Sequence, residues 1–140
     1  MLFDKLMVTL STLLEAATPY GVPVARALLA AVFLYSGWQK LWYWQDSVKE
    51  VTALGLPFAP LFAAGTIAIQ LAGGLAVISG FAAAFGAAIL AAFTIAATLL
   101  GHRFWLLHGD AAKRELTTSL EHLGIVGGLV LVIIEALQGS

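Results

Sequence analysis

Long apolar stretches, separated by two short polar connections, dominate the chain. No charged residue and no histidine occurs between Val51 and Gly101. Because a membrane-spanning helix needs about 20 apolar residues, this stretch predicts two spans with a turn at Ser79-Gly80. One further span is predicted before this stretch and one after it. The four predicted spans are residues 22–44, 59–79, 81–106 and 116–137.

The first 20 residues have a different pattern. Leu6, Leu10 and Leu13 recur at helical spacing, and polar residues fill the opposite face. This pattern is typical of an amphipathic helix that lies in the membrane interface. Thr18-Pro19-Tyr20-Gly21 predicts that this helix ends before the first span. A signal peptide is the alternative, although Asp4 and several hydroxyl residues interrupt its apolar segment.

Composition supports a membrane protein. Hydrophobic residues make up 61% of the 140 residues and charged residues only 11%, whereas soluble domains carry about 25% charge. A net charge of −1 gives no basic surplus for binding nucleic acid. The absence of cysteine excludes disulfides, thiol relays and cysteine-held metal centres. We expect an all-α integral membrane four-helix bundle over residues 21–140, preceded by the interfacial helix over residues 1–20.

The basic residues predict the orientation in the membrane. Two of them, Lys5 and Arg26, lie on the side of the termini. The others lie on the side of the two polar connections: Lys40, Lys49, Arg103, Lys113 and Arg114. Since cytoplasmic loops carry the excess of Lys and Arg, we expect the connections in the cytoplasm and both termini outside it.

Each span carries one stripe of polar or small residues. Such stripes face the interior of a membrane bundle, because polar side chains are costly against lipid. This predicts a compact bundle with a polar cluster near the connection side. Candidate ligand-binding residues are Gln39, Lys40, Gln70, Thr98, His102, Trp105 and His122.

Within this cluster, Lys40 and His102 are the candidate catalytic residues. A lysine or an imidazole can bind an anionic or carbonyl-bearing headgroup, and histidine exchanges protons near neutral pH. The alternative is that the charged members only mark helix ends in the headgroup zone. Gln70, near the midplane, is either a hydrogen bond between helices or the inner end of a pocket.

Three further features carry less chemistry. Arg26 and Glu135 lie near the terminal side and suit a structural ion pair. The three histidines lack metal-ligand spacing, so no metal site is expected. Gly124 and Gly128 form a GxxxG spacing, which fits packing within the chain or a contact between two copies in a homo-oligomer.

Four segments resemble the successive helix signatures of the DoxX family. They are Phe33-Leu34-Tyr35-Ser36-Gly37-Trp38-Gln39-Lys40-Leu41, Gln70-Leu71-Ala72-Gly73-Gly74-Leu75, Thr98-Leu99-Leu100-Gly101-His102-Arg103-Phe104-Trp105 and Glu121-His122-Leu123-Gly124. They occur in order, and the resemblance covers about residues 22–137. The chain departs from the family where Gln70 replaces a frequent Glu, and where Glu121-His122 replace a frequent Lys-Asn.

The resemblance implies a small bacterial inner-membrane protein with four helices. Members of this family include the membrane subunit of a thiosulfate:quinone oxidoreductase. We therefore expect a quinone-linked redox subunit in the lipid bilayer, with a redox partner subunit, no covalently bound cofactor and a quinone headgroup near the polar cluster. A non-enzymatic scaffold, assembly or stress-associated membrane protein is the alternative, and a small-molecule transporter is a third interpretation.

Overall fold

The computed structural model describes residues 1–139, and every regular element in that range is a helix. The elements are α1 (Leu2–Trp42), α2 (Trp44–Ala53), α3 (Ala59–Ser79), α4 (Ala83–Gly101), the short 3₁₀-helix η1 (Phe104–Leu106) and α5 (Gly109–Gln138). Four helical segments in this range are long and apolar enough to cross a membrane: α1, α3, α4 extended to Leu106, and α5. The prediction of four spans is therefore confirmed.

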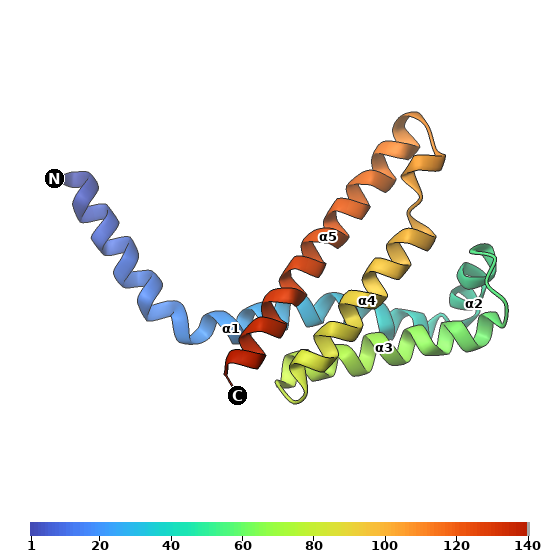
Figure 1. Ribbon diagram of the computed structural model, residues 1–140, viewed down its shortest axis with the longest axis horizontal. Helices are drawn as coiled ribbons and strands as arrows, with labels where there is room; N and C mark the ends of the chain where they lie inside the picture. The colour runs from blue at the N-terminus through green and yellow to red at the C-terminus, as the bar shows by residue number, and fades with distance from the viewer. Residues whose placement is uncertain (140) are drawn as a thin grey trace.

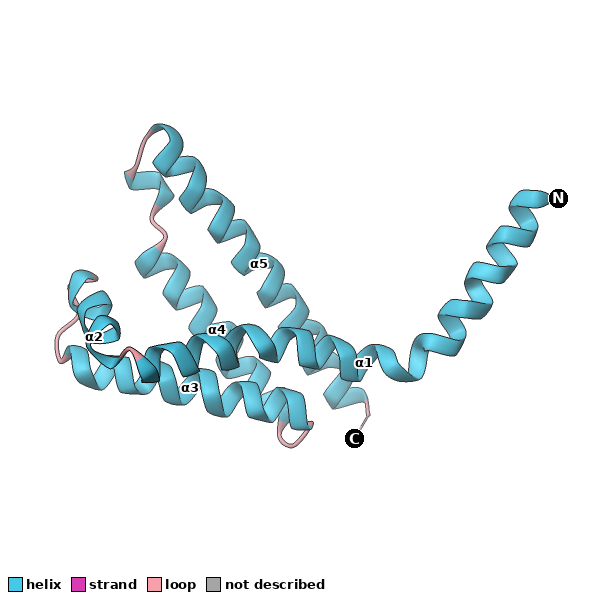
Figure 2. Ribbon diagram, turned by 180° about the vertical axis from the view of Figure 1, so that it is seen from behind, coloured by secondary structure: helices cyan, strands magenta, loops and turns pink. Residues whose placement is uncertain are grey.

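The four long helices form two pairs that diverge from one another. The C-terminal half of α1 packs against α3, and α4 packs against α5. The pairs meet where α3 turns into α4, and they spread apart toward α2 and η1 (Figures 1 and 2). The arrangement is thus an open V rather than the compact bundle we expected. Below, the end that contains Gly80 is called the closed end, and the end with α2 and η1 the open end.

Small residues bring the two pairs together at the closed end. A Cβ atom on Gly86 would lie only 2.6 Å from the Cβ of Ala76, and one on Gly73 would lie 2.7 Å from the Leu90 side chain. Gly80 ends α3 with a φ of 81°, which glycine adopts without steric cost. The buried core consists of Ala30, Phe33, Val77, Ala83, Ala87, Leu90, Ala91, Leu129 and Val132.

Helix α1 does not end where the sequence predicted. It runs as one helix of 41 residues through Pro19 and Pro23, and Figure 1 shows that it changes direction in this region. Proline removes a backbone donor and pushes on the preceding turn, so it bends a helix that tertiary context does not end. Residues 1–25 are exposed, and this N-terminal half stands away from both pairs.

Two other boundaries differ clearly from the predicted spans. Helix α4 ends at Gly101, and the chain leaves helical geometry at His102 before the single turn of η1. Helix α5 begins at Gly109 rather than at residue 116, and Asp110 in its first turn stabilises that early start through the helix dipole. The first polar connection contains the short helix α2.

Candidate functional site

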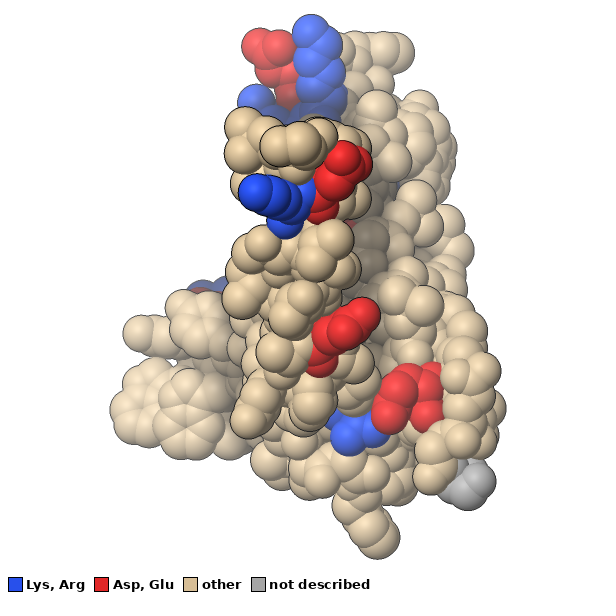
Figure 3. All heavy atoms as spheres, turned by 90° about the vertical axis from the view of Figure 1, so that its left-hand side faces the viewer, with Lys and Arg blue, Asp and Glu red and all other residues tan. Residues whose placement is uncertain are grey.

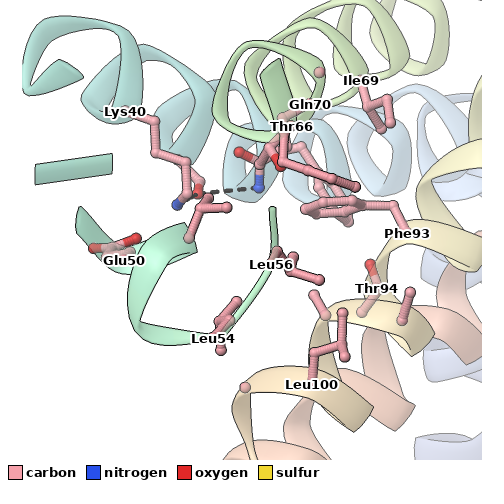
Figure 4. Close-up of a pocket in the computed structure, with 18 of the residues that line it drawn as sticks. Lys40, Glu50, Leu54, Leu56, Thr66, Ile69, Gln70, Phe93, Thr94 and Leu100 are labelled. Atoms are coloured by element: carbon pink, nitrogen blue, oxygen red, sulfur yellow. Dashed lines mark hydrogen bonds between the residues drawn. The ribbon is translucent and has the colours of Figure 1, made fainter. Parts of the chain in front are cut away.

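The space between the two helix pairs at the open end is a cleft of about 860 Å³. All five α-helices and the loop after α2 contribute to its lining, which is mostly apolar. Figure 4 shows Lys40 and Gln70 on one side of this cleft and Thr94 and Leu100 on the other. Leu54 and Leu56, from the end of α2 and the loop after it, also lie against the cleft. A space of this size and polarity is typical of small-molecule sites.

The α1/α3 side of the cleft carries a hydrogen-bonded group of three residues, called here the Ser36 wall. The Oγ of Ser36 accepts one hydrogen bond from Lys40 Nζ at 2.9 Å and another from Gln70 Nε2 at 3.1 Å. Gln70 is only 5% exposed, and its Oε1 atom is buried without a hydrogen-bond partner among the described residues. A buried acceptor without a partner is costly. The Ser36 wall therefore contains one acceptor, Gln70 Oε1, that a bound ligand could satisfy, and it also contains the amino group of Lys40.

The α4/α5 side carries two imidazoles, and the carboxylate of Glu115 lies beside one of them. The Nδ1 atom of His102 lies 2.6 Å from Glu115 Oε2. An ionised carboxylate only accepts hydrogen bonds, so His102 donates from Nδ1 and its Nε2 remains free of this contact. His102, His122 and Glu115 are called here the histidine wall, and both rings line the cleft.

The contact with Thr98 indicates which ring nitrogen of His122 carries a proton. Thr98 donates its hydroxyl proton to the Thr94 carbonyl at 2.7 Å, and its Oγ1 lies 2.7 Å from His122 Nδ1. Because Thr98 has one proton to donate, His122 Nδ1 must be the donor in their contact. The ring of His122 meets that of His102 edge to face, with centroids 5.0 Å apart.

The structure brings four of the seven predicted ligand-binding residues to the cleft: Lys40, Gln70, His102 and His122. Thr98 lies behind them, in contact with His122. Gln70 donates a hydrogen bond from α3 to Ser36 on α1 and also lines the cleft.

Gln39 and Trp105 are not in the cleft. Gln39 lies one residue before Lys40, which rotates it by about 100° around the helix, and it lines a shallow outer groove with Trp38, Trp42 and Tyr43. Trp105 is 51% exposed on η1. Its helical projection failed because α4 ends at Gly101, so spacing beyond that point no longer predicts a face.

Sequence reasoning missed Ser36, Glu115 and Glu50 as members of the site. Ser36 precedes Lys40 by one helical turn, and that spacing was the available signal. Glu115 and Glu50 were assigned to polar connections, but Glu50 on α2 lines the cleft and Glu115 on the early turns of α5 faces His102. These contacts depend on how the chain turns back, which the pattern of a single helix does not indicate.

The predicted pair of Arg26 and Glu135 lies at the closed end, away from the cleft. Arg26 Nη2 contacts Glu135 Oε2 at 2.7 Å and links α1 to α5. Figure 3 shows how sparse charged side chains are on one face of the molecule. Within residues 1–139, no three His, Cys, Asp or Glu side chains are grouped so that they could hold a metal ion.

Comparison with known proteins gives the family. Residues 21–103, more than half of the chain, match the DoxX family. The chain belongs to the DoxX family. This DoxX protein is 30% identical to the inner membrane protein YqjF of Escherichia coli K12 over 116 residues, covering 81% of this chain and 82% of YqjF. It is 24% identical to the inner membrane protein YphA of the same organism over 119 residues, 85% of each chain. No solved structure matches.

The predicted DoxX membership is thus confirmed, both relatives are inner membrane proteins, and this chain has four helices long and apolar enough to cross a membrane among its described residues. The DoxX match includes the whole Ser36 wall and His102. It ends before α5, so Glu115 and His122 lie outside it.

Proposed function

We propose that this DoxX protein binds the headgroup of a lipophilic quinone in its cleft, as the membrane subunit of a quinone-linked redox system. The observation that carries the proposal is the buried Gln70, which lines a mostly apolar cleft together with Lys40 and whose Oε1 has no hydrogen-bond partner among the described residues. A buried acceptor without a partner in the protein suits a ligand that supplies the missing donor.

The Ser36 wall fits both redox forms of such a headgroup. Lys40 donates to a carbonyl oxygen of the oxidised form, and Gln70 Oε1 accepts from a hydroxyl group of the reduced form. Apolar side chains around them, including Phe93 and Leu100, exclude water and suit the ring. When bound, a quinone supplies two-electron, two-proton chemistry, while these residues bind and orient it.

The alternatives account for less of the structure. In a scaffold protein the polar stripes would serve only packing, yet they surround a cleft of about 860 Å³ that side chains leave open. A transporter needs a path across the membrane, whereas the core residues Leu90 and Leu129 fill the closed end. Uptake measurements in proteoliposomes separate a transporter from a binding protein.

The proposal is tested by measuring the quinone that co-purifies with the protein in mild detergent. We expect near-stoichiometric quinone with the wild type and strong depletion in Lys40→Ala and Gln70→Leu. Gln39→Ala is the matched control, because Gln39 adjoins Lys40 in sequence but lies outside the cleft. Quinone no higher than in an unrelated membrane protein would overturn the proposal and favour the scaffold interpretation.

We also propose that the exposed N-terminal half of α1 lies in the membrane interface. At about 1.5 Å per residue, α1 is about 60 Å long, twice the thickness of the hydrocarbon core. The bend near Pro19 and Pro23 allows the amphipathic half to turn away from the spanning half. We place both termini outside the cytoplasm, on the charge asymmetry of the chain.

Single cysteines test this placement, because the chain has none of its own. In intact cells, a membrane-impermeant maleimide is expected to label Glu15→Cys readily and Leu10→Cys poorly, because Leu10 lies on the apolar face. Lys49→Cys, on α2, is expected to react only after permeabilisation. Equal labelling of Glu15→Cys and Leu10→Cys would contradict the interfacial position, and labelling of Lys49→Cys in intact cells would reverse the orientation.

A further inference from the structure

His102 and Glu115, in the histidine wall, form a pair that has no part in the proposed binding of the headgroup. His102 Nδ1 and Glu115 Oε2 are 2.6 Å apart, and both side chains are about one-third exposed, at 31% and 33%. The two residues come from different helical segments, at the end of α4 and in the early part of α5. His102 also lines the cleft, so the pair connects the cleft with the exposed surface at the open end.

This geometry prepares His102 to act as a base. The carboxylate fixes the tautomer with the proton on Nδ1, which leaves the Nε2 lone pair to accept a proton. The same carboxylate then stabilises the imidazolium that forms, as it does in other carboxylate–histidine pairs. The Nδ1 atom of His122 contacts Thr98, whereas the Nδ1 atom of His102 contacts Glu115.

We infer that His102 is the base that takes the hydroxyl proton of a bound quinol, and that Glu115 is the positioning residue that orients it. This inference rests on the proposed function and makes the reduced form, the quinol, the substrate of the site. In each of two steps an O–H bond breaks, an N–H bond forms at His102 Nε2 and one electron passes to a one-electron acceptor. After each step His102 releases the proton on Nε2 to water, since its side chain is 31% exposed, and the tautomer with the proton on Nδ1 is restored.

The electron acceptor is a one-electron oxidant, supplied in the cell by a redox partner and in the test by ferricyanide. Two ferricyanide ions take the two electrons of one quinol, and two protons enter the solvent. General base catalysis of this kind contributes about 10²–10⁴-fold. Removing the base therefore changes the rate of quinol oxidation, whereas the Ser36 wall maintains binding.

The experiment uses the full chain in detergent with decylubiquinol, and it measures the Kd and the rate of oxidation by ferricyanide. Micelles without protein give the background rate. We expect His102→Ala to lower the rate by about 100-fold and Glu115→Gln by about tenfold, each with nearly unchanged Kd. Added imidazole is expected to restore His102→Ala, which it would not do if His102 were only structural.

Two controls make the outcome specific. Asp110→Asn removes another carboxylate of α5, exposed at its first turn, and is expected to oxidise quinol at the wild-type rate. Glu115→Asp keeps a carboxylate and is expected to recover part of the rate lost in Glu115→Gln. Circular dichroism confirms that each variant is folded.

The outcomes separate this inference from the proposed function. If the wild type binds decylubiquinol and the His102→Ala and Glu115→Gln variants oxidise it at the wild-type rate, the inference is overturned and the binding site stands. If both variants lose affinity for quinol instead of rate, the pair binds the ligand and is not a base. If the wild type does not bind decylubiquinol at all, both proposals fail.

Discussion

The closed and open ends of the V are built from the same helices, but small residues dominate the closed end and polar residues line the open end. At the closed end, Gly73 and Gly86 bring α3 so close to α4 that an added Cβ atom would collide. Toward the open end the same two helices separate, and Gln70 lines the cleft between them with its Oε1 left without a hydrogen-bond partner among the described residues. The closed end is therefore expected to determine the stability of the fold, and under the proposed function the open end binds the ligand. Substitutions at the closed end should therefore change the free energy of unfolding, and substitutions at the open end should change the Kd for the quinone.

The largest expected effect on folding is at the crossing of α3 and α4. Gly86→Val places side-chain atoms against Ala76 and against the backbone oxygen of Gly73, which cannot move aside. We expect a loss of about 3 kcal/mol in the free energy of unfolding, measured by denaturant titration in mixed micelles. Gly124→Ala is the control, because nothing lies within 4 Å of its added Cβ. Equal stability of the two variants would show that the closed end is not tightly packed.

The open end should show the reverse behaviour. Gln70→Leu removes the unpartnered Oε1 together with the bond to Ser36, so the free energy of unfolding should change by less than about 1 kcal/mol. The Kd for a quinone analogue should rise at least about tenfold, because the site loses an acceptor aimed at the ligand. A large loss of stability with unchanged Kd would make Gln70 a packing residue and would end the contrast between the two ends.

The ion pair at the closed end should contribute less than the helix crossing. Arg26 and Glu135 link α1 to α5, but the Glu135 side chain is 41% exposed, which weakens the attraction through solvent screening. We expect Arg26→Ala to lower the free energy of unfolding by about 1 kcal/mol and to leave quinone binding unchanged. A double-mutant cycle with Glu135→Gln measures the pair itself, and a coupling energy of zero would contradict the assigned role.

The smallest expected effect is a gain in stability. Ala82, in the turn between α3 and α4, has a φ of 53°, which costs energy for any residue with a Cβ atom. Ala82→Gly should raise the free energy of unfolding by about 0.5–1 kcal/mol. The same denaturant titration detects this gain, and a loss instead would show that the Ala82 side chain packs more favourably than its backbone strain costs.

The sequence was sufficient to predict the helical spans but not their arrangement. Long uncharged stretches predict spans because lipid tolerates little else. The V shape was not predictable, because it results from the contact of Gly73 with Leu90 and of Gly86 with Ala76, and wheel projections place small residues inward without identifying their partners. The bend in α1 was mistaken for an end, since proline in a sequence indicates both.

Within the site, helical spacing brought some predicted residues to the cleft and misplaced others. Gln70 lies well inside α3 and Lys40 lies in the last turn of α1, and both line the cleft. Gln39, the neighbour of Lys40 on α1, does not. Trp105 lies beyond the end of α4, where the helical period no longer applies. Glu115 was missed because its partner His102 is on another segment, and such a pairing depends on tertiary structure.

Photoaffinity labelling with an azidoquinone tests the central claim, that the open cleft binds a quinone headgroup, most directly. The purified protein is irradiated with the probe, with and without excess decylubiquinone, and the modified residues are mapped by mass spectrometry. We predict labels on the cleft segments of α3 and α4, around Gln70 and Thr94, that excess quinone suppresses and that Lys40→Ala reduces. Labels spread along the lipid-facing surfaces and unaffected by competitor would contradict the claim.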